Sequence, residues 1–270
     1  MNYAYITLLS SRTYYDGVLI LHRSLLSVNS RYPLLCMISK GLEREVVSGL
    51  QEEGIRCICL QDSLSVNSRN KKCHLHWDNT FDKLHVWGMT RYEKLIYLDS
   101  DMVIVRNIDH LFSYPAFSAV SAGCSYPGNE HWIGALNSGL MVVEPDSAVE
   151  RCLMNSIQSV VSKFNTEGKD VGDQDVIKEY CKDWALKSDL HLDEGYNMFA
   201  DYLTYYIRKC NYTWLDGDGK ELYVIHFIGK VKPWMKKNIK NLIWLFLMIC
   251  RNPLYLSAYR YACSFLRLKK

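Results

Sequence analysis

Short apolar runs alternate along this chain with segments whose apolar residues recur at helical spacing. The first run, Tyr3–Leu9, is followed by Gly17–Leu26, in which Val18, Leu21 and Leu25 share one helical face. Further strands are expected at Leu34–Ile38, Ile55–Leu60, Lys94–Leu98, Ala119–Ala122, Leu140–Val143 and Tyr223–Phe227, with helices over Leu42–Gln51, Asp78–Tyr92 and Ala148–Lys163. Strands and helices that alternate in this way build an α/β fold with a mostly parallel sheet.

The size and composition of the chain are those of an ordinary globular protein. Its 270 residues allow one large domain or two small ones, and 49% of them are hydrophobic and 23% charged, which excludes a disordered chain. A net charge of +3 is too small to indicate nucleic-acid binding. We expect one compact domain over residues 1–235 and an apolar, basic helical tail over residues 236–270.

The tail carries the basic excess of the chain. It contains eight Lys and Arg residues and no acidic one, so the other 235 residues carry a formal charge of −5. Leu242–Cys250 is apolar throughout but only about half as long as a membrane span. In the segment 254–268, the polar residues Ser257, Arg260, Ser264 and Arg267 form one helical stripe. Two interpretations stay open: a helix docked on the body, or a cationic amphipathic anchor that gives peripheral membrane contact.

Cysteine placement and the N-terminus favour a reducing compartment. The ten cysteines include no Cys-x-x-Cys pair, and several of them, such as Cys36 and Cys250, lie inside apolar runs. The segment Met1–Leu9 lacks a basic region followed by a long apolar stretch. The expected location is therefore cytoplasmic, with association at the cytosolic face of a membrane if the tail is an anchor.

The apolar strand Lys94–Leu98 delivers two carboxylates, Asp99 and Asp101, to its carboxyl end. Open α/β sheets bind ligands at this edge. Carboxylate oxygens suit Mg²⁺ or Mn²⁺, and these ions in turn hold phosphate oxygens. The pair therefore predicts a metal–diphosphate site.

Two enzyme classes place Asp-x-Asp at the end of a strand. In metal-dependent nucleotide-sugar transferases the pair holds a cation, whereas in haloacid-dehalogenase-like phosphatases Asp99 would be the nucleophile and Asp101 a general acid. The phosphatase motif normally lies on an early strand and needs a downstream acidic cluster that Gly172-Asp173-Gln174-Asp175 does not match. The transferase interpretation is favoured.

Six stretches together resemble the glycogenin and galactinol synthase branch of the retaining family 8 glycosyltransferases. They are Ile6-Thr7-Leu8 with Tyr14 and Gly17; Asp82–Trp87; Leu98-Asp99-Ser100-Asp101 with Asn107–Phe112; Leu136-Asn137-Ser138-Gly139; Gly172-Asp173-Gln174; and His226–Trp234. The resemblance implies a Rossmann-like nucleotide-sugar-binding domain of the GT-A type with a central mixed sheet. It also implies Mn²⁺ and a UDP-glucose or UDP-galactose donor.

The resemblance assigns the metal and the donor nucleotide to particular residues. Asp99, Asp101 and His226 would ligate Mn²⁺, and Lys232 and Gly229 would approach the diphosphate. Further donor contacts would come from Leu8, Ser10, Ser11, Tyr14, Lys83, Ser100 and Ser138. Ser11 stands where glycogenins tend to have Asn.

The hexose and the catalytic step are likewise assigned by resemblance. Asp173 would bind sugar hydroxyls and Gln174 would lie near the anomeric carbon, with Asn137 and Lys232 completing the catalytic group. Retention requires a covalent carboxylate intermediate or same-face attack, and the residues do not decide between them.

The predicted function is therefore Mn²⁺-dependent hexose transfer from a UDP-sugar to a hydroxyl acceptor, which could be a glycan, a polyol or a protein. Self-glycosylation and a homodimer are compatible with this family. The alternative is a non-catalytic sugar-nucleotide-binding module on the same fold.

Overall fold

The central sheet is mixed and mostly parallel. The computed structural model describes residues 2–64, 80–214, 217–236 and 238–267. The seven strands of the sheet lie in the order β3 (Arg56–Cys59), β2 (Leu34–Ile38), β1 (Tyr3–Leu9), β4 (Lys94–Leu98), β7 (Asn137–Val143), β6 (Ala119–Val120) and β8 (His191–Leu192). The first four run parallel, and β7 is antiparallel to both β4 and β6. The carboxyl ends of β1 and β4 therefore meet at one edge.

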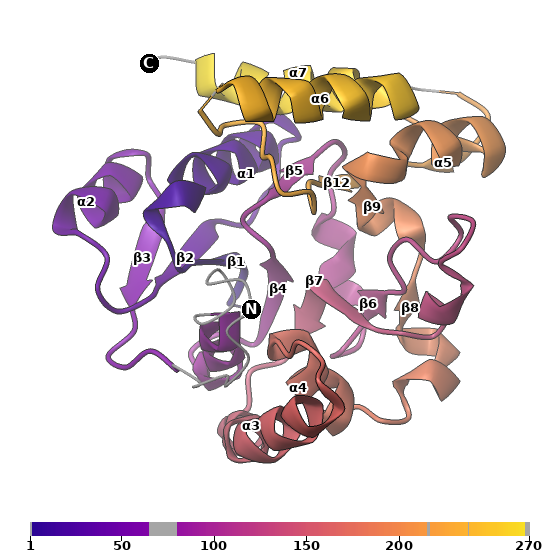
Figure 1. Cartoon of the computed structure of the whole chain (residues 1–270). Coiled ribbons are helices and arrows are strands. Elements are labelled where there is room, and N and C mark those ends of the chain that lie inside the picture. Colours follow the sequence, from indigo (N-terminus) through magenta and orange to yellow (C-terminus); the bar gives the residue numbers. More distant parts are fainter. Residues whose placement is uncertain (1, 65–79, 215–216, 237, 268–270) are drawn as a thin grey trace.

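Helices cover both faces of this sheet (Figure 1). The helices α1 (Tyr15–Ser27) and α2 (Arg44–Glu52) pack on one face, and α3 (Ser147–Glu167), α4 (Asp173–Tyr180) and the 3₁₀ segment η2 (Thr80–Gly88) pack on the other. Alternate residues of β1 reach the two layers, since Tyr5 contacts the first and Ile6 the second. A strand buried on both faces is continuously apolar, as the sequence of β1 is.

Three strands have the bounds that the sequence predicts, and one predicted helix has another conformation. β1, β2 and β4 begin and end at the expected residues, while β7 starts three residues before the predicted Leu140. The helix expected over Asp78–Tyr92 is instead the 3₁₀ segment η2, and residues 78 and 79 lie outside the described residues. Asp82 and Lys83 are buried in η2 together with its apolar residues. The segment therefore lacks the solvated face of an amphipathic α-helix.

A second, three-stranded sheet carries part of the site. Its strands are β5 (Met102–Ile104), β12 (Val224–His226) and β9 (Met198–Phe199), with β12 in the middle. β12 is antiparallel to β5, so His226 lies opposite Met102, one residue after Asp101. The helix α5 (Leu203–Lys209) packs beside this sheet in a third apolar cluster.

The remaining short elements connect these layers. They are the strands β10 (Tyr212–Thr213) and β11 (Lys220–Glu221) and the 3₁₀ turns η1 (Arg12–Tyr14), η3 (Asp109–Ser113), η4 (Glu130–Trp132), η5 (Trp184–Leu186), η6 (Ser188–Leu190), η7 (Glu194–Tyr196) and η8 (Ala200–Tyr202).

Two helices, α6 (Ile239–Arg251) and α7 (Leu254–Arg267), lie side by side across one end of the molecule (Figure 1). Helix α7 packs on α1 and α5 and buries Tyr255, Ala258 and Phe265. Arg23 of α1 donates a hydrogen bond to the Phe265 carbonyl at 2.7 Å. The polar stripe of α7 faces solvent, so this helix is docked on the body. Across the described part of the chain, every helix is too short or too polar to span a bilayer.

We expect Gly17→Ala to destabilise the fold. A Cβ at residue 17 would lie 2.4 Å from the Ser100 carbonyl oxygen and 2.8 Å from the Trp234 ring, so backbone must shift. Overpacking of this kind costs about 1–3 kcal/mol, which exceeds the roughly 1 kcal/mol that alanine gains in helix propensity. Urea unfolding should show this loss. Gly217→Ala is the control, because its Cβ would meet Thr213 Oγ1 at an ordinary 3.4 Å. Equal midpoints for the two variants would contradict the prediction.

Candidate active site

The turn that links β4 to β5 holds the two aspartates in place through backbone hydrogen bonds. The Asp99 N–H donates to the Gly139 carbonyl of β7 at 2.8 Å. The Phe227 N–H, directly after β12, donates to the Asp101 carbonyl at 3.0 Å. The turn is thus fixed to both sheets, and each sheet contributes one side of the site.

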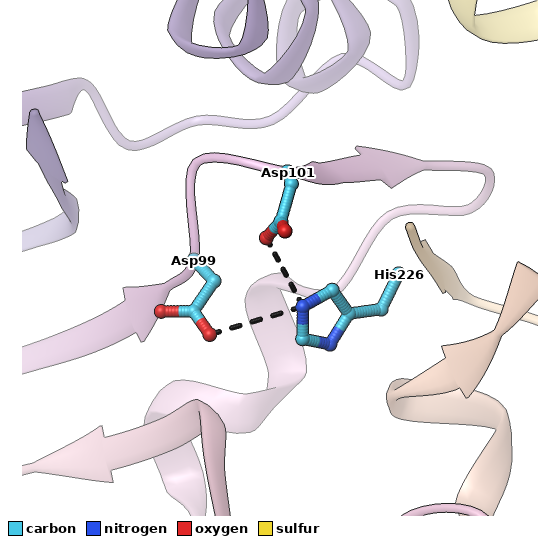
Figure 2. A group of neighbouring side chains, drawn as sticks. All are labelled: Asp99, Asp101 and His226. Atoms are coloured by element: carbon cyan, nitrogen blue, oxygen red, sulfur yellow. Dashed lines mark ion pairs between the residues drawn. The ribbon is translucent and has the colours of Figure 1, made fainter. Parts of the chain in front are cut away.

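Asp99, Asp101 and His226 converge on one point (Figure 2). His226 Nε2 lies 3.0 Å from Asp101 Oδ1 and 3.8 Å from Asp99 Oδ2. One potential ligand atom from each residue lies within 4.8 Å of the others. Two carboxylates and an imidazole form a donor set for a first-row divalent cation and leave further coordination positions open.

A chain of hydrogen bonds determines which nitrogen of His226 carries the proton. The Gly139 N–H donates to Asn137 Oδ1 at 3.0 Å, and Asn197 Nδ2 donates to the same oxygen at 2.8 Å. Asn197 therefore presents Oδ1 to His226 Nδ1, 2.9 Å away, and Nδ1 must be the donor. In neutral His226 the Nε2 lone pair then points toward the carboxylates, as a metal ligand requires. The residues present fit a divalent cation such as Mn²⁺.

Two buried lysines flank the aspartates. Lys83 Nζ lies 3.0 Å from Asp99 Oδ1 and 2.8 Å from Asp173 Oδ2, at the start of α4. Lys232 Nζ lies 2.7 Å from Asp101 Oδ2 and also donates to the Phe227 carbonyl. Each of these buried or half-buried carboxylates therefore has a cationic partner, which offsets the cost of removing it from water.

These partners shift the pKa of each group. Burial by itself would raise the pKa of Asp101, but Lys232 and His226 hold it well below its ordinary value. Burial raises the pKa of Asp99, with Asp101 adding to the rise and Lys83 opposing it. Burial alone would lower the pKa of Lys83, yet Asp173 and Asp99 keep it above normal. Asp101 thus stays ionised at neutral pH, which is unsuited to the general acid that the phosphatase alternative requires.

The cluster lies in a cavity of about 360 Å³. Twelve of the residues singled out in the sequence line it: Leu8, Ser10, Tyr14, Lys83, Asp99, Ser100, Asp101, Ser138, Asp173, Gln174, His226 and Lys232. Ser138 Oγ donates to Asp173 Oδ2 at 2.9 Å, and the Ser138 N–H donates to Gln174 Oε1 at 3.1 Å. The volume and the mixed lining are those of a small-molecule site.

Three of the singled-out residues lie elsewhere. Ser11 caps the turn η1 with its side chain. Asn137 accepts a hydrogen bond from Asn197, the residue that holds His226. Together with Gln174 it also borders a smaller cavity of about 180 Å³. Gly229 lies against Trp244 of α6, where a Cβ would approach the ring to 3.0 Å.

Other residues join the site although the family resemblance assigns them no role. The cavity is also lined by Thr80, Tyr97, Gly172, Asp175 and Ile228. The hydroxyl of Tyr97 donates to Asp99 Oδ1 at 3.1 Å, although its place in an apolar strand suggests a core residue. Asn197 is fully buried and holds His226, but it belongs to none of the motifs. Asn197 directly precedes β9, and the pairing of β9 with β12 brings it beside His226.

The structure thus brings together two carboxylates and one imidazole that could hold a cation, at the strand ends of an α/β sheet and beside two buried lysines. A family model described as Glycosyl transferase family 8 matches residues 5–238. The chain belongs to this family, which argues against the phosphatase alternative.

Curated relatives include glycogenin-1 of Caenorhabditis elegans, 31% identical over 87% of this chain and 51% of the relative. The uncharacterized protein R707 of Acanthamoeba polyphaga mimivirus is 31% identical over 88% of this chain and 84% of the relative. Inositol phosphorylceramide glucuronosyltransferase 1 of Arabidopsis thaliana is 30% identical over 86% of this chain and 42% of the relative. The chain thus spans about half the length of the glycogenin relative.

Solved structures share the fold. The galactosyltransferase LgtC, in complex with donor and acceptor sugar analogs, superposes with a TM-score of 0.59 at 14% identity, over 90% of this chain and 95% of that one. The apo glycosyltransferase GlyE of Streptococcus pneumoniae TIGR4 superposes with a TM-score of 0.58 at 16% identity, over 98% of this chain and 64% of that one. The predicted GT-A fold is confirmed.

We expect Lys83→Met to destabilise the protein strongly. The change leaves the buried carboxylate of Asp173 and the half-buried carboxylate of Asp99 without their shared cation, and breaking a buried ion pair costs about 3–5 kcal/mol. Urea unfolding followed by tryptophan fluorescence measures the loss. Lys163→Met is the matched control, because its pair with Glu179 is largely exposed, and it should change stability by less than about 1 kcal/mol. A small loss in both variants would show that the Lys83 pairs contribute little.

Proposed function

We propose that the protein transfers a hexose, with retention of configuration, from a UDP-sugar to a hydroxyl acceptor, and that it uses Mn²⁺. The observation that carries the proposal is the convergence of Asp99, Asp101 and His226 beside Lys83 and Lys232. A diphosphate leaving group needs positive charge where its own charge develops. A divalent cation, when bound, acts as a Lewis acid on the diphosphate.

The residues that line the cavity could hold the different parts of such a donor. Leu8, at the end of β1, and Ser10 and Tyr14, after it, line the cavity and would hold the uracil and ribose. The Lys232 ammonium lies 5.9 Å from the centre of the Tyr14 ring, and it would turn from Asp101 toward the diphosphate. Asp173 and Gln174, at the start of α4, would hold the hexose. The nucleotide, diphosphate and sugar would thus each have residues of the cavity to hold them.

The charges in the cavity favour a neutral hexose such as glucose or galactose. The lysines that line it, Lys83 and Lys232, already pair with carboxylates. The Asp173 carboxylate stands where the sugar would bind, and it would repel the carboxylate of a uronic acid. Several relatives are named glucuronosyltransferases, and we propose a neutral hexose in place of the glucuronic acid of their names.

The contacts of Asp173 bear on how configuration is retained. Its Oδ2 is paired with Lys83 and accepts a hydrogen bond from Ser138, and both contacts reduce its nucleophilicity. Gln174 Oε1 is engaged by the Ser138 N–H, which leaves its Nε2 to donate to the sugar. We favour same-face attack, in which these residues orient the hexose and the departing phosphate assists the incoming hydroxyl.

Asp101→Asn should reduce Mn²⁺-stimulated hydrolysis of UDP-glucose and UDP-galactose by about 100-fold or more, because the loss of one carboxylate weakens stabilisation of the leaving diphosphate. Released UDP measures the rate. Asp62→Asn changes an exposed carboxylate and should match the wild type. Equal rates in all three proteins would contradict the metal role of Asp101. If the wild type binds UDP-sugars without turnover, the chain is instead a binding module.

Asn197→Ala should weaken Mn²⁺ binding by about 10–100-fold, because loss of the Asn197 oxygen releases the His226 ring from its orientation. Titration followed by electron paramagnetic resonance of free Mn²⁺ measures this without any substrate. Asn107→Ala removes a comparable amide, which donates to the Val28 carbonyl away from the site, and should leave Mn²⁺ affinity unchanged. Unaltered affinity in Asn197→Ala would show that the hydrogen-bond chain does not position the imidazole.

A further inference from the structure

The outward face of α6 is an exposed apolar stripe. Its members recur at helical spacing and expose between 46% and 76% of their surface: Ile239, Leu242, Ile243, Phe246 and Leu247. Residues at positions i, i+3, i+4, i+7 and i+8 form one continuous face of a helix. A cluster of five large apolar side chains on one exposed helix marks a binding surface rather than scattered exposure.

The opposite face of α6 explains why the stripe points outward. Trp244, Leu245 and Met248 pack on the third apolar cluster, and the Trp244 ring stacks edge-on against Tyr255 of α7 at 5.8 Å. The buried Asn252, between the helices, accepts a hydrogen bond from the Thr204 N–H at 2.9 Å. These contacts fix the rotation of α6 about its axis, so the stripe cannot turn inward without breaking them.

Basic side chains border the stripe on both sides. Lys240 and Arg251 are exposed on α6 itself, eleven residues or about three turns apart, and therefore on the same flank. On the other side, Arg260 and Arg267 of α7 line a groove shared with Leu242. The sequence from residue 236 to 270 contains no acidic residue. Apolar side chains between two rows of long cationic ones are typical of a helix that lies in the plane of a membrane surface.

We propose that α6 docks in the interface of an anionic lipid bilayer. The stripe would enter the boundary between head groups and acyl chains, while Lys240, Arg251, Arg260 and Arg267 contact anionic head groups. Charge decides between this occupant and a second copy of the chain, because two copies meeting through this face would bring their cationic rows together. The docking helix is α6 and not α7, whose apolar face is buried against α1 and α5.

The docking face is connected to the proposed donor site. Trp244, on the inner face of α6, lies against Gly229 in the loop that carries Lys232. The hydroxyl of Tyr255 in α7 is 3.5 Å from the Val231 carbonyl of the same loop. The bilayer would therefore lie beyond α6, on the side of the molecule where this loop closes the cavity. The inference rests on surface chemistry and stands apart from the proposed transfer reaction.

The test compares sedimentation of the full chain with vesicles of phosphatidylcholine alone or with about 30% phosphatidylserine. Ile243→Asp/Phe246→Asp should lower the bound fraction on anionic vesicles at least tenfold, and Lys240→Glu/Arg251→Glu should lower it severalfold with a weaker salt dependence. The matched control is Leu26→Asp/Leu186→Asp, which puts the same change at exposed apolar residues on other elements and should bind like the wild type. Far-ultraviolet circular dichroism and UDP-sugar hydrolysis in the absence of vesicles should be unchanged in all variants.

Two outcomes would overturn the proposal. The first is equal sedimentation of the wild type and Ile243→Asp/Phe246→Asp on anionic vesicles. The second is a wild type that ignores vesicles but shows a concentration-dependent dimer in analytical ultracentrifugation, lost in the same variant, which would assign the stripe to a second copy. Because hydrolysis is measured without lipid, failure of the docking proposal and failure of the transfer proposal give different results.

Discussion

The structure around the site depends on one buried carboxylate and its two partners. Asp101 lies between His226 Nε2, at 3.0 Å, and Lys232 Nζ, at 2.7 Å. A buried charge is tolerated only when it is paired, so both partners must reach the turn after β4. The short sheet of β5, β12 and β9 does this, since the pairing of β12 with β5 places His226 beside the turn. The second sheet therefore brings His226 to the site at the strand ends of the first sheet.

Much of the fold follows from local sequence, because the buried strands are continuous apolar runs. β1, β2 and β4 could be bounded to the residue in this way. The segment Thr80–Gly88 could not, because the spacing of its apolar residues predicts an α-helix, whereas the structure has a 3₁₀ segment in which Asp82 and Lys83 are also buried. Asp82 accepts a hydrogen bond from the Leu64 N–H at 2.6 Å, and Lys83 meets Asp99 and Asp173. Contacts with residues distant in sequence, and not the local spacing of apolar residues, thus determine the conformation of this segment.

Some residues of the candidate site can likewise be predicted from local sequence, and others cannot. Residues within motifs, such as Asp99, Asp101 and Asp173, could be named from the sequence and line one cavity. Tyr97 and Asn197 could not, because a tyrosine in an apolar strand and an isolated asparagine carry no chemical signal of their own. Ser11 is expected at the nucleotide, and its side chain caps the turn η1, so its contact with a nucleotide stays a prediction. The tail shows the reverse: its composition indicated an amphipathic helix, but only tertiary packing decided that α7 is docked and α6 exposed.

The residues around the cavity come from places as far apart as Leu8 and Lys232 along the chain. In an unfolded chain these groups are scattered, so a nucleotide or cation that needs several of them at once binds the native state alone. By mass action, such a ligand raises the free energy of unfolding. The increase is about 2.7 kcal/mol when the free ligand concentration is a hundred times the dissociation constant. The resistance of this protein to heat and proteolysis would thus vary with the amount of donor around it.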